Sequence, residues 1–152
     1  MVQTLTFYHS IFRWLVLASL IYSIFRAAKG YWSKSSFGKV DNLVRHWTAT
    51  IAHIQLTIGI VLYSQSSVVK YFWTNFKAAS TNKDAAFFGL IHIFLMLLAV
   101  VFITIGSALA KRKTGDHEKF KTMLVWFSVT LFIIFIAIPW PFSPLANRPY
   151  LR

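Results

Sequence analysis

Residues Leu5–Arg26 have the sequence LTFYHSIFRWLVLASLIYSIFR, and this stretch decides the fold. It is long and apolar enough to cross the hydrocarbon core of a bilayer as one helix, which requires about 20 residues. It also contains His9 and Arg13, which lie one helical turn apart. Because ionisable side chains are costly in hydrocarbon, we expect these two residues to be functional.

The composition of the whole chain is that of a membrane protein. Of its 152 residues, 57% are hydrophobic and only 13% are charged, which is unlike an ordinary soluble domain. A chain of this length predicts a single domain, residues 1–152. There is no cysteine, which excludes disulfides, thiolate metal sites, cysteine nucleophiles and covalently attached haem. We expect no cleaved signal peptide, because no basic segment precedes the first apolar stretch.

Four stretches are long and apolar enough to span a bilayer as helices. We place these spans at about residues 5–26, 43–66, 85–110 and 122–140. None alternates with the period of two that a transmembrane strand requires. The sequence therefore predicts an all-α fold, a four-helix transmembrane bundle with up-down topology.

The Lys and Arg residues give this bundle an orientation. The net charge is +12, and the first and third connections carry twice as many basic residues as the second connection and the C-terminal tail. Short basic connections stay in the cytoplasm. Both termini are therefore expected on the outer side of the membrane. Anionic lipid headgroups explain the basic excess, and we expect no nucleic-acid partner.

Two histidines are expected at the same depth of the bundle. At a rise of about 1.5 Å per residue, His9 lies roughly 25 Å above Arg26, and His92 roughly 27 Å above Lys111. They lie on the first and third helices, which face each other diagonally in an up-down bundle. Two imidazoles in this arrangement could be the axial metal ligands of haem b, or they could be structural histidines with hydrogen-bond partners.

Small residues near His92 favour the haem interpretation. Gly89 lies three residues before His92, and Met96 and Ala99 continue the same helix face. This face could leave room for a flat macrocycle, although small residues also serve ordinary helix packing.

Arg13 needs an anion or several oxygen acceptors at its depth. All four acidic residues of the chain lie in the predicted connections, so no carboxylate within a span can neutralise it. A haem propionate is one candidate partner. A lipid phosphate reached by snorkelling, the backbone carbonyls of a broken helix and a quinone carbonyl are the others.

His53 lies only about 12 Å above Arg45, so it cannot share one iron with His9 and His92. It could ligate a second haem together with another subunit, bind quinone, or donate a hydrogen bond to a carbonyl. We assign His46 and His117 to the interface and to a loop.

The chain resembles small bacterial four-helix membrane proteins labelled cytochrome b, which are similar in plan to cytochrome b561-type bundles. The matching stretches are HSIFRW at residues 9–14, HIQLTIGIVLY at 53–63, TIG at 104–106 and IPWPF at 138–142. Together they occur in order over nearly the whole chain.

The resemblance implies a haem-binding role in electron transfer or quinol chemistry that involves His9, His53 and His92. The unequal depth of His53 departs from the paired pattern of a two-haem bundle. We therefore expect a membrane cytochrome that passes electrons between a quinol pool and a redox partner protein, and not a stand-alone enzyme. The alternative is a non-catalytic integral subunit or assembly factor of a larger membrane complex.

Overall fold

The chain forms an elongated helical bundle in the computed structural model, which describes residues 2–151. Within this range there is no strand. In chain order the elements are α1 (Val2–Trp32), α2 (Lys39–Gln65), α3 (Ser67–Thr74), α4 (Phe76–Ala79), α5 (Lys83–Ala86), the π-helical turn η1 (Phe87–Ile91), α6 (His92–Arg112) and α7 (Asp116–Ala137).

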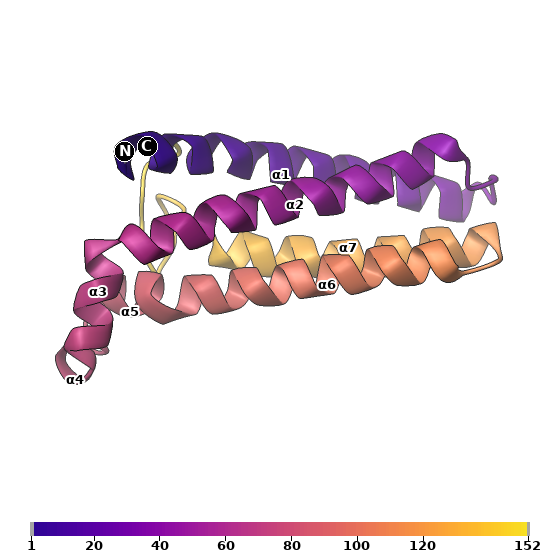
Figure 1. The fold of residues 1–152 in the computed structure, drawn as a ribbon. Helices are drawn as coiled ribbons and strands as arrows, with labels where there is room; N and C mark the ends of the chain where they lie inside the picture. The colour runs from indigo at the N-terminus through magenta and orange to yellow at the C-terminus, as the bar shows by residue number, and fades with distance from the viewer. Residues whose placement is uncertain (1, 152) are drawn as a thin grey trace.

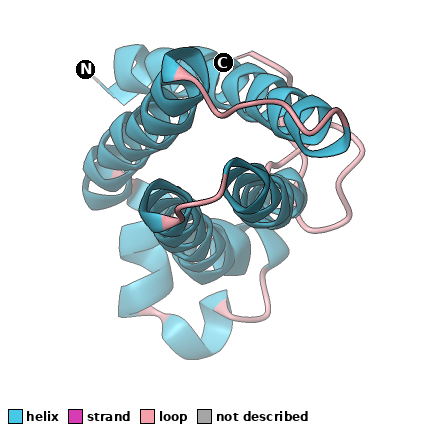
Figure 2. Cartoon of the chain, turned by 90° about the vertical axis from the view of Figure 1, so that its right-hand side faces the viewer, coloured by secondary structure: helices cyan, strands magenta, loops and turns pink. Residues whose placement is uncertain are grey.

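The four long helices α1, α2, α6 and α7 lie side by side (Figures 1 and 2). Helix α1 packs against α2 and α7, and α6 packs against α7 and α2. Helices α1 and α6 therefore occupy opposite corners of the bundle. The short helices α3 and α4 form a separate turn of chain at one end, and α5 continues through η1 into α6 (Figure 1).

Three helical segments are long and apolar enough to cross a membrane, namely Val2–Trp32, Lys83–Arg112 and Asp116–Ala137. These segments contain the predicted spans at 5–26 and 85–110 and most of the span at 122–140. The predicted span at 43–66 forms α2, which is helical but is not among the candidates. Its most apolar stretch contains His53 and Gln55, which lower its mean hydropathy.

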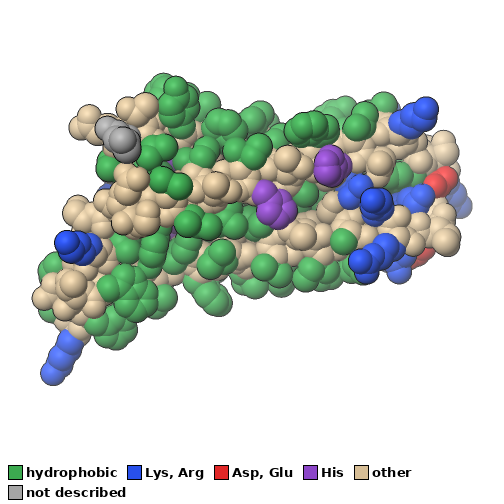
Figure 3. All heavy atoms as spheres, in the orientation of Figure 1, with side chains coloured by type: hydrophobic (Ala, Val, Ile, Leu, Met, Phe, Trp, Pro, Cys, Tyr) green, Lys and Arg blue, Asp and Glu red, His purple; other side chains and the backbone are tan. Residues whose placement is uncertain are grey.

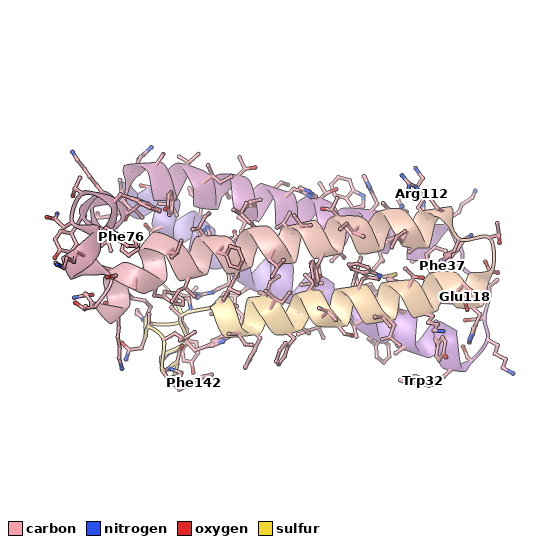
Figure 4. All side chains as sticks on the ribbon, turned by 90° about the horizontal axis from the view of Figure 1, so that it is seen from below. Trp32, Phe37, Phe76, Arg112, Glu118 and Phe142 are labelled. Carbon is pink, nitrogen blue, oxygen red and sulfur yellow. The ribbon has the colours of Figure 1, made fainter. Side chains whose placement is uncertain are left out.

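Hydrophobic side chains cover the length of the bundle, whereas Lys and Arg gather at the end that carries the α1–α2 and α6–α7 connections (Figure 3). We call this the basic end. Arg112 and Glu118 lie there together with Trp32 and Phe37 (Figure 4). The opposite end, which we call the terminal end, carries both chain termini (Figure 1). Phe76 and Phe142 lie at the terminal end (Figure 4).

The half of the bundle near the basic end is closely packed. A Cβ built on Gly30 would lie 2.4 Å from the ring of Phe120, and one on Gly106 would lie 2.3 Å from Cβ of Trp126. Only glycine allows such close approach of a helix to a neighbouring aromatic side chain. Buried Arg45 donates to the carbonyl and hydroxyl oxygens of Ser107 at 3.1 and 2.5 Å.

Helix α7 ends at Ala137, two residues before Pro139, because proline lacks the amide hydrogen that a helix needs and constrains the residue before it. Residues 138–151, which we call the C-terminal tail, then cross the terminal end of the bundle. The carbonyl of Tyr150 accepts hydrogen bonds from Nη2 of Arg13 and, at 3.3 Å, from Nε1 of Trp14. The tail thereby returns to the first helix.

Candidate functional site

A cavity of about 210 Å³ lies inside the half of the bundle near the terminal end. All four long helices contribute to its walls, and α3 and the C-terminal tail contribute to its outer part. Along α2 it extends from Ala52 to Ser66, which is about 20 Å at 1.5 Å per residue. Its walls are mostly apolar, and their polar side chains include those of His9, Arg13, Gln55, His92 and Arg148.

His9 and His92 face each other across this cavity from the two diagonal helices. Their ring centroids are 6.4 Å apart and their planes are inclined by 70°. Two imidazoles that bind one metal ion from opposite sides, each through a bond of about 2.0–2.1 Å, have centroids roughly 6.3 Å apart. The spacing of the two rings therefore fits a shared metal centre between them.

The π-helical turn η1 sets the direction of the His92 side chain. This turn ends at Ile91, directly before His92, and the extra residue that a π-turn inserts rotates the next residues about the helix axis. The hydroxyl of Tyr63 donates to the carbonyl of Gly89 within the turn at 2.7 Å. Such turns are frequent at functional sites.

His92 already has the hydrogen bond that a metal-ligating histidine requires on its second nitrogen. Its Nδ1 lies 2.8 Å from the carbonyl oxygen of Ala137, and because a carbonyl can only accept, Nδ1 carries the hydrogen in this bond. A neutral imidazole then has its free lone pair on Nε2. Metal-ligating histidines commonly donate their other N–H to a backbone carbonyl in this way.

His9 packs against α2. A Cβ built on Gly59 would lie 3.2 Å from Cε1 and 3.8 Å from Nδ1 of His9, so the ring edge approaches the helix where a side chain is missing. The amide Nε2 of Gln55 donates to the backbone carbonyl of His9 at 2.9 Å. Among the described residues, Nδ1 of His9 and Oε1 of Gln55 are buried polar atoms without a hydrogen-bond partner.

Two arginines line the cavity. Arg13 comes from α1, one turn beyond His9, and its guanidinium group binds the carbonyl of Tyr150. Arg148 comes from the C-terminal tail, where its Nη2 pairs with Asp84 at 2.7 Å and its guanidinium lies 4.9 Å from the ring of Phe88. Between residues 2 and 151, no acidic side chain lines the cavity. Its polar character is therefore basic.

The structure brings three of the four predicted site residues together and leaves the fourth outside. His9, Arg13 and His92 line the cavity, whereas His53 is exposed on the outer face of α2. Nδ1 of His53 lies 2.7 Å from the carbonyl of Ala49, and Nε2 lies 3.2 Å from Oγ1 of Thr104. This contact is the carbonyl hydrogen bond named among its three predicted roles, while ligation of a second haem and quinone binding stay predictions.

The interpretation of Gly89 as room for a macrocycle was wrong. Phe72 of α3 occupies that space, since a Cβ on Gly89 would lie 2.3 Å from its ring. Met96 and Ala99 do line the cavity. Because helix α3 folds back onto η1, Gly89 serves helix packing.

Sequence reasoning also missed three contributors, Gln55, Gly59 and Arg148. The spacing of Gln55 and Gly59, four residues apart on one helix, was a signal that both face the same neighbour. For Arg148 the sequence offered no comparable signal, because an irregular segment has no regular spacing that tells which residues face the same neighbour.

No known protein family, curated protein or solved structure matches this chain. Within residues 2–151 there is also no cluster of three or more histidine, aspartate or glutamate side chains that could hold a metal ion. A functional assignment therefore depends on the two-histidine cavity itself.

Proposed function

We propose that this protein is a membrane cytochrome that binds haem b between His9 and His92 and transfers electrons between a quinol pool and a redox partner protein. The observation that carries the proposal is the 6.4 Å spacing of the two imidazole rings across an internal cavity. Axial ligation by two neutral histidine nitrogens is a standard way in which proteins hold haem iron.

The membrane arrangement is part of the same proposal. Helix α2 packs between α1 and α6, both of which belong to segments apolar enough to span, so α2 crosses the membrane with them. The protein is then a four-helix transmembrane bundle. With the basic end in the cytoplasm, both termini and the cavity lie near the outer face of a bacterial inner membrane.

The surroundings of the two histidines support haem over a smaller ligand. The carbonyl of Ala137 fixes the tautomer of His92 so that Nε2 is available as a ligand. Arg13 and Arg148 are cationic side chains in the cavity wall that would pair with haem propionates, with Arg148 shared between a propionate and Asp84. The sequence analysis named only Arg13 as a propionate partner, and the proposal now adds Arg148.

Bound haem would supply one-electron redox chemistry, and the chain would supply its ligands and its electrostatic environment. Guanidinium groups that offset the negative propionates in a poorly solvated cavity would stabilise the less positive oxidation state of a neighbouring metal centre. The arginines therefore raise the reduction potential, which suits electron transfer from quinols. A bound quinone would accept hydrogen bonds from the same arginines.

The test is a reduced-minus-oxidised absorption spectrum of the detergent-purified protein, with a pyridine haemochrome assay for haem per chain. We expect a b-type α band close to one haem per chain. His9→Ala and His92→Ala should each abolish it, whereas His53→Ala, the matched control on the outer face of α2, should retain it.

A colourless wild-type protein from cells with adequate haem supply would contradict the proposal. So would haem that persists in both His9→Ala and His92→Ala. A colourless protein that co-purifies in stoichiometric amount with other membrane subunits would favour the alternative, a non-catalytic subunit or assembly factor.

A further inference from the structure

We propose that Gln55 positions His9 as a metal ligand, by accepting a hydrogen bond from Nδ1–H of His9 on its side-chain oxygen. This inference rests on the proposed function, because it concerns the second nitrogen of a haem ligand. It assigns a role to a residue on α2, a long helix that supplies no axial ligand to the proposed centre.

The side chain of Gln55 already forms a hydrogen bond with the backbone of His9. Its Nε2 donates to the backbone carbonyl of His9 at 2.9 Å, across the interface between α2 and α1. This bond holds the amide group next to the residue whose ring needs a partner. It also fixes which end of the amide is the donor, so that Oε1 is the end left to accept.

The two unpartnered atoms are chemically complementary. Nδ1 of His9 is a ring nitrogen that can carry a hydrogen, and Oε1 of Gln55 can only accept one. Both atoms are buried and both residues line the same cavity. Because a buried polar group without a partner is costly, side-chain rotamers that pair these two atoms are favoured.

The packing of His9 turns its Nδ1 toward the correct helix. The ring edge formed by Cε1 and Nδ1 faces Gly59, at 3.2 and 3.8 Å from a Cβ built on that glycine. Gln55 lies four residues before Gly59 and therefore on the same face of α2. A larger residue at Gly59 would push this edge away from the helix that carries the acceptor.

The hydrogen bond at His92 shows the effect expected of a bond between Gln55 and His9. There, Nδ1 is held by the carbonyl of Ala137, which leaves Nε2 for the metal. For His9, Gln55 supplies an equivalent acceptor from α2. Both imidazoles then present the same nitrogen to the centre between them.

The experiment compares Gln55→Leu and Gln55→Glu with the wild type, with Thr57→Val on the exposed face of α2 as the matched control. Loss of the acceptor in Gln55→Leu should weaken haem binding about tenfold or more, the usual range for a lost outer-shell partner. Gln55→Glu keeps an acceptor for Nδ1–H and should therefore bind haem more tightly than Gln55→Leu, although both variants lose the donor to the backbone carbonyl of His9. Because a carboxylate makes the imidazole a stronger donor to the metal, the reduction potential should fall in Gln55→Glu and rise in Gln55→Leu.

A purely structural role of Gln55 would not move the potential in opposite directions in the two variants. Unchanged potentials and haem affinity in both would overturn the inference while leaving the proposed function intact.

A second measurement does not need haem. In haem-free protein selectively labelled with ¹⁵N-histidine, NMR should assign the hydrogen of His9 to Nδ1 in the wild type and to Nε2 in Gln55→Leu. The same tautomer in both proteins would overturn the inference. If the tautomer differs between the two proteins but the wild-type protein does not bind haem, the Gln55–His9 bond is supported and the proposed function is contradicted.

Discussion

The two halves of the bundle use the same four helices in opposite ways. Near the basic end, glycines bring the helices into contact with Phe120 and Trp126, and buried Arg45 has acceptors on Ser107. Near the terminal end the same helices surround a cavity with two facing histidines, and buried polar atoms of His9 and Gln55 there have no hydrogen-bond partner among the described residues. The difference separates a closely packed half, which stabilises the fold, from a half with an internal cavity, where we propose that a ligand binds.

The buried polar groups differ in the same way. Near the basic end, the hydroxyl groups of Ser23 and Thr48 are 2.6 Å apart, and Arg26 pairs with Asp41 at 2.7 Å. Near the terminal end, Nδ1 of His9 and Oε1 of Gln55 lack partners. Because native proteins seldom retain buried unpaired polar groups, these atoms support the proposal that a ligand binds in this half.

The largest expected effect is that of Gly106→Ala in the packed half. The added Cβ would lie 2.3 Å from Cβ of Trp126 and must separate α6 from α7. We expect the free energy of unfolding to fall by about 2–3 kcal/mol, measured by denaturation in mixed micelles. Gly115→Ala is the control, since no described atom lies within 4 Å of its added Cβ. Equal stability of the two variants would mean that the close contact is not required.

Ser107→Ala tests the polar contact in the packed half. It removes the hydroxyl that accepts from Nη1 of Arg45 at 2.5 Å but keeps the carbonyl acceptor at 3.1 Å. We expect a loss of about 1–2 kcal/mol in the same unfolding measurement, because a buried charged group becomes less well paired. Ser64→Ala on the exposed face of α2 should change stability by less than about 0.5 kcal/mol. If both substitutions lowered the free energy of unfolding by a similar amount, the contact between Ser107 and Arg45 would not contribute specifically to stability.

Gly59→Ala is the matched test in the hollow half. The new Cβ would lie 3.2 Å from Cε1 of His9, which can move into the cavity. Alanine also favours a helix over glycine, so the free energy of unfolding should change by less than about 1 kcal/mol. Haem affinity should nevertheless fall about tenfold, an equivalent of about 1.4 kcal/mol, as titration would show. Destabilisation as large as that of Gly106→Ala would contradict the contrast between the halves.

Asp84→Asn should have the smallest effect. It breaks the pair with Arg148, which is partly exposed, so the free energy of unfolding should fall by less than about 0.5 kcal/mol. The local consequence is a looser C-terminal tail, seen as faster amide hydrogen exchange over residues 145–151. Asp116→Asn, which disturbs only the longer 3.9 Å pair with Lys119 at the basic end, should leave that exchange unchanged. Faster amide hydrogen exchange of the C-terminal tail in both variants would mean that the pair between Asp84 and Arg148 does not specifically hold the tail.

Much of the candidate site was predictable because a helix has a fixed rise. His9 and His92 were expected at one depth on diagonal helices, and the structure places their rings 6.4 Å apart. The prediction did not need the π-helical turn, which changes the direction of the His92 side chain more than its depth. Depth depends on residue number alone, whereas direction depends on how the preceding turn is wound.

The position of Gly89 shows why other features of the site could not be predicted from the sequence. A glycine beside His92 is equally compatible with a ligand and with a neighbouring helix, and only the return of α3 decides that Phe72 fills the space. His53 is a similar case. Its depth excluded it from the centre of His9 and His92, but its exposed position and its contact with Thr104 depend on how α2 is rotated against α6.

The sequence by itself determined that this chain is helical, that it contains segments long and apolar enough to span a membrane, and that ionisable residues in those segments are few. Hydrophobic length and the fixed rise of the helix suffice for these conclusions. Only the tertiary structure decided that one half is packed and the other hollow, and that Gln55, Gly59 and Arg148 surround the facing histidines. Those contacts join residues far apart in the chain, and their formation depends on helix rotation and close packing, which no local pattern encodes.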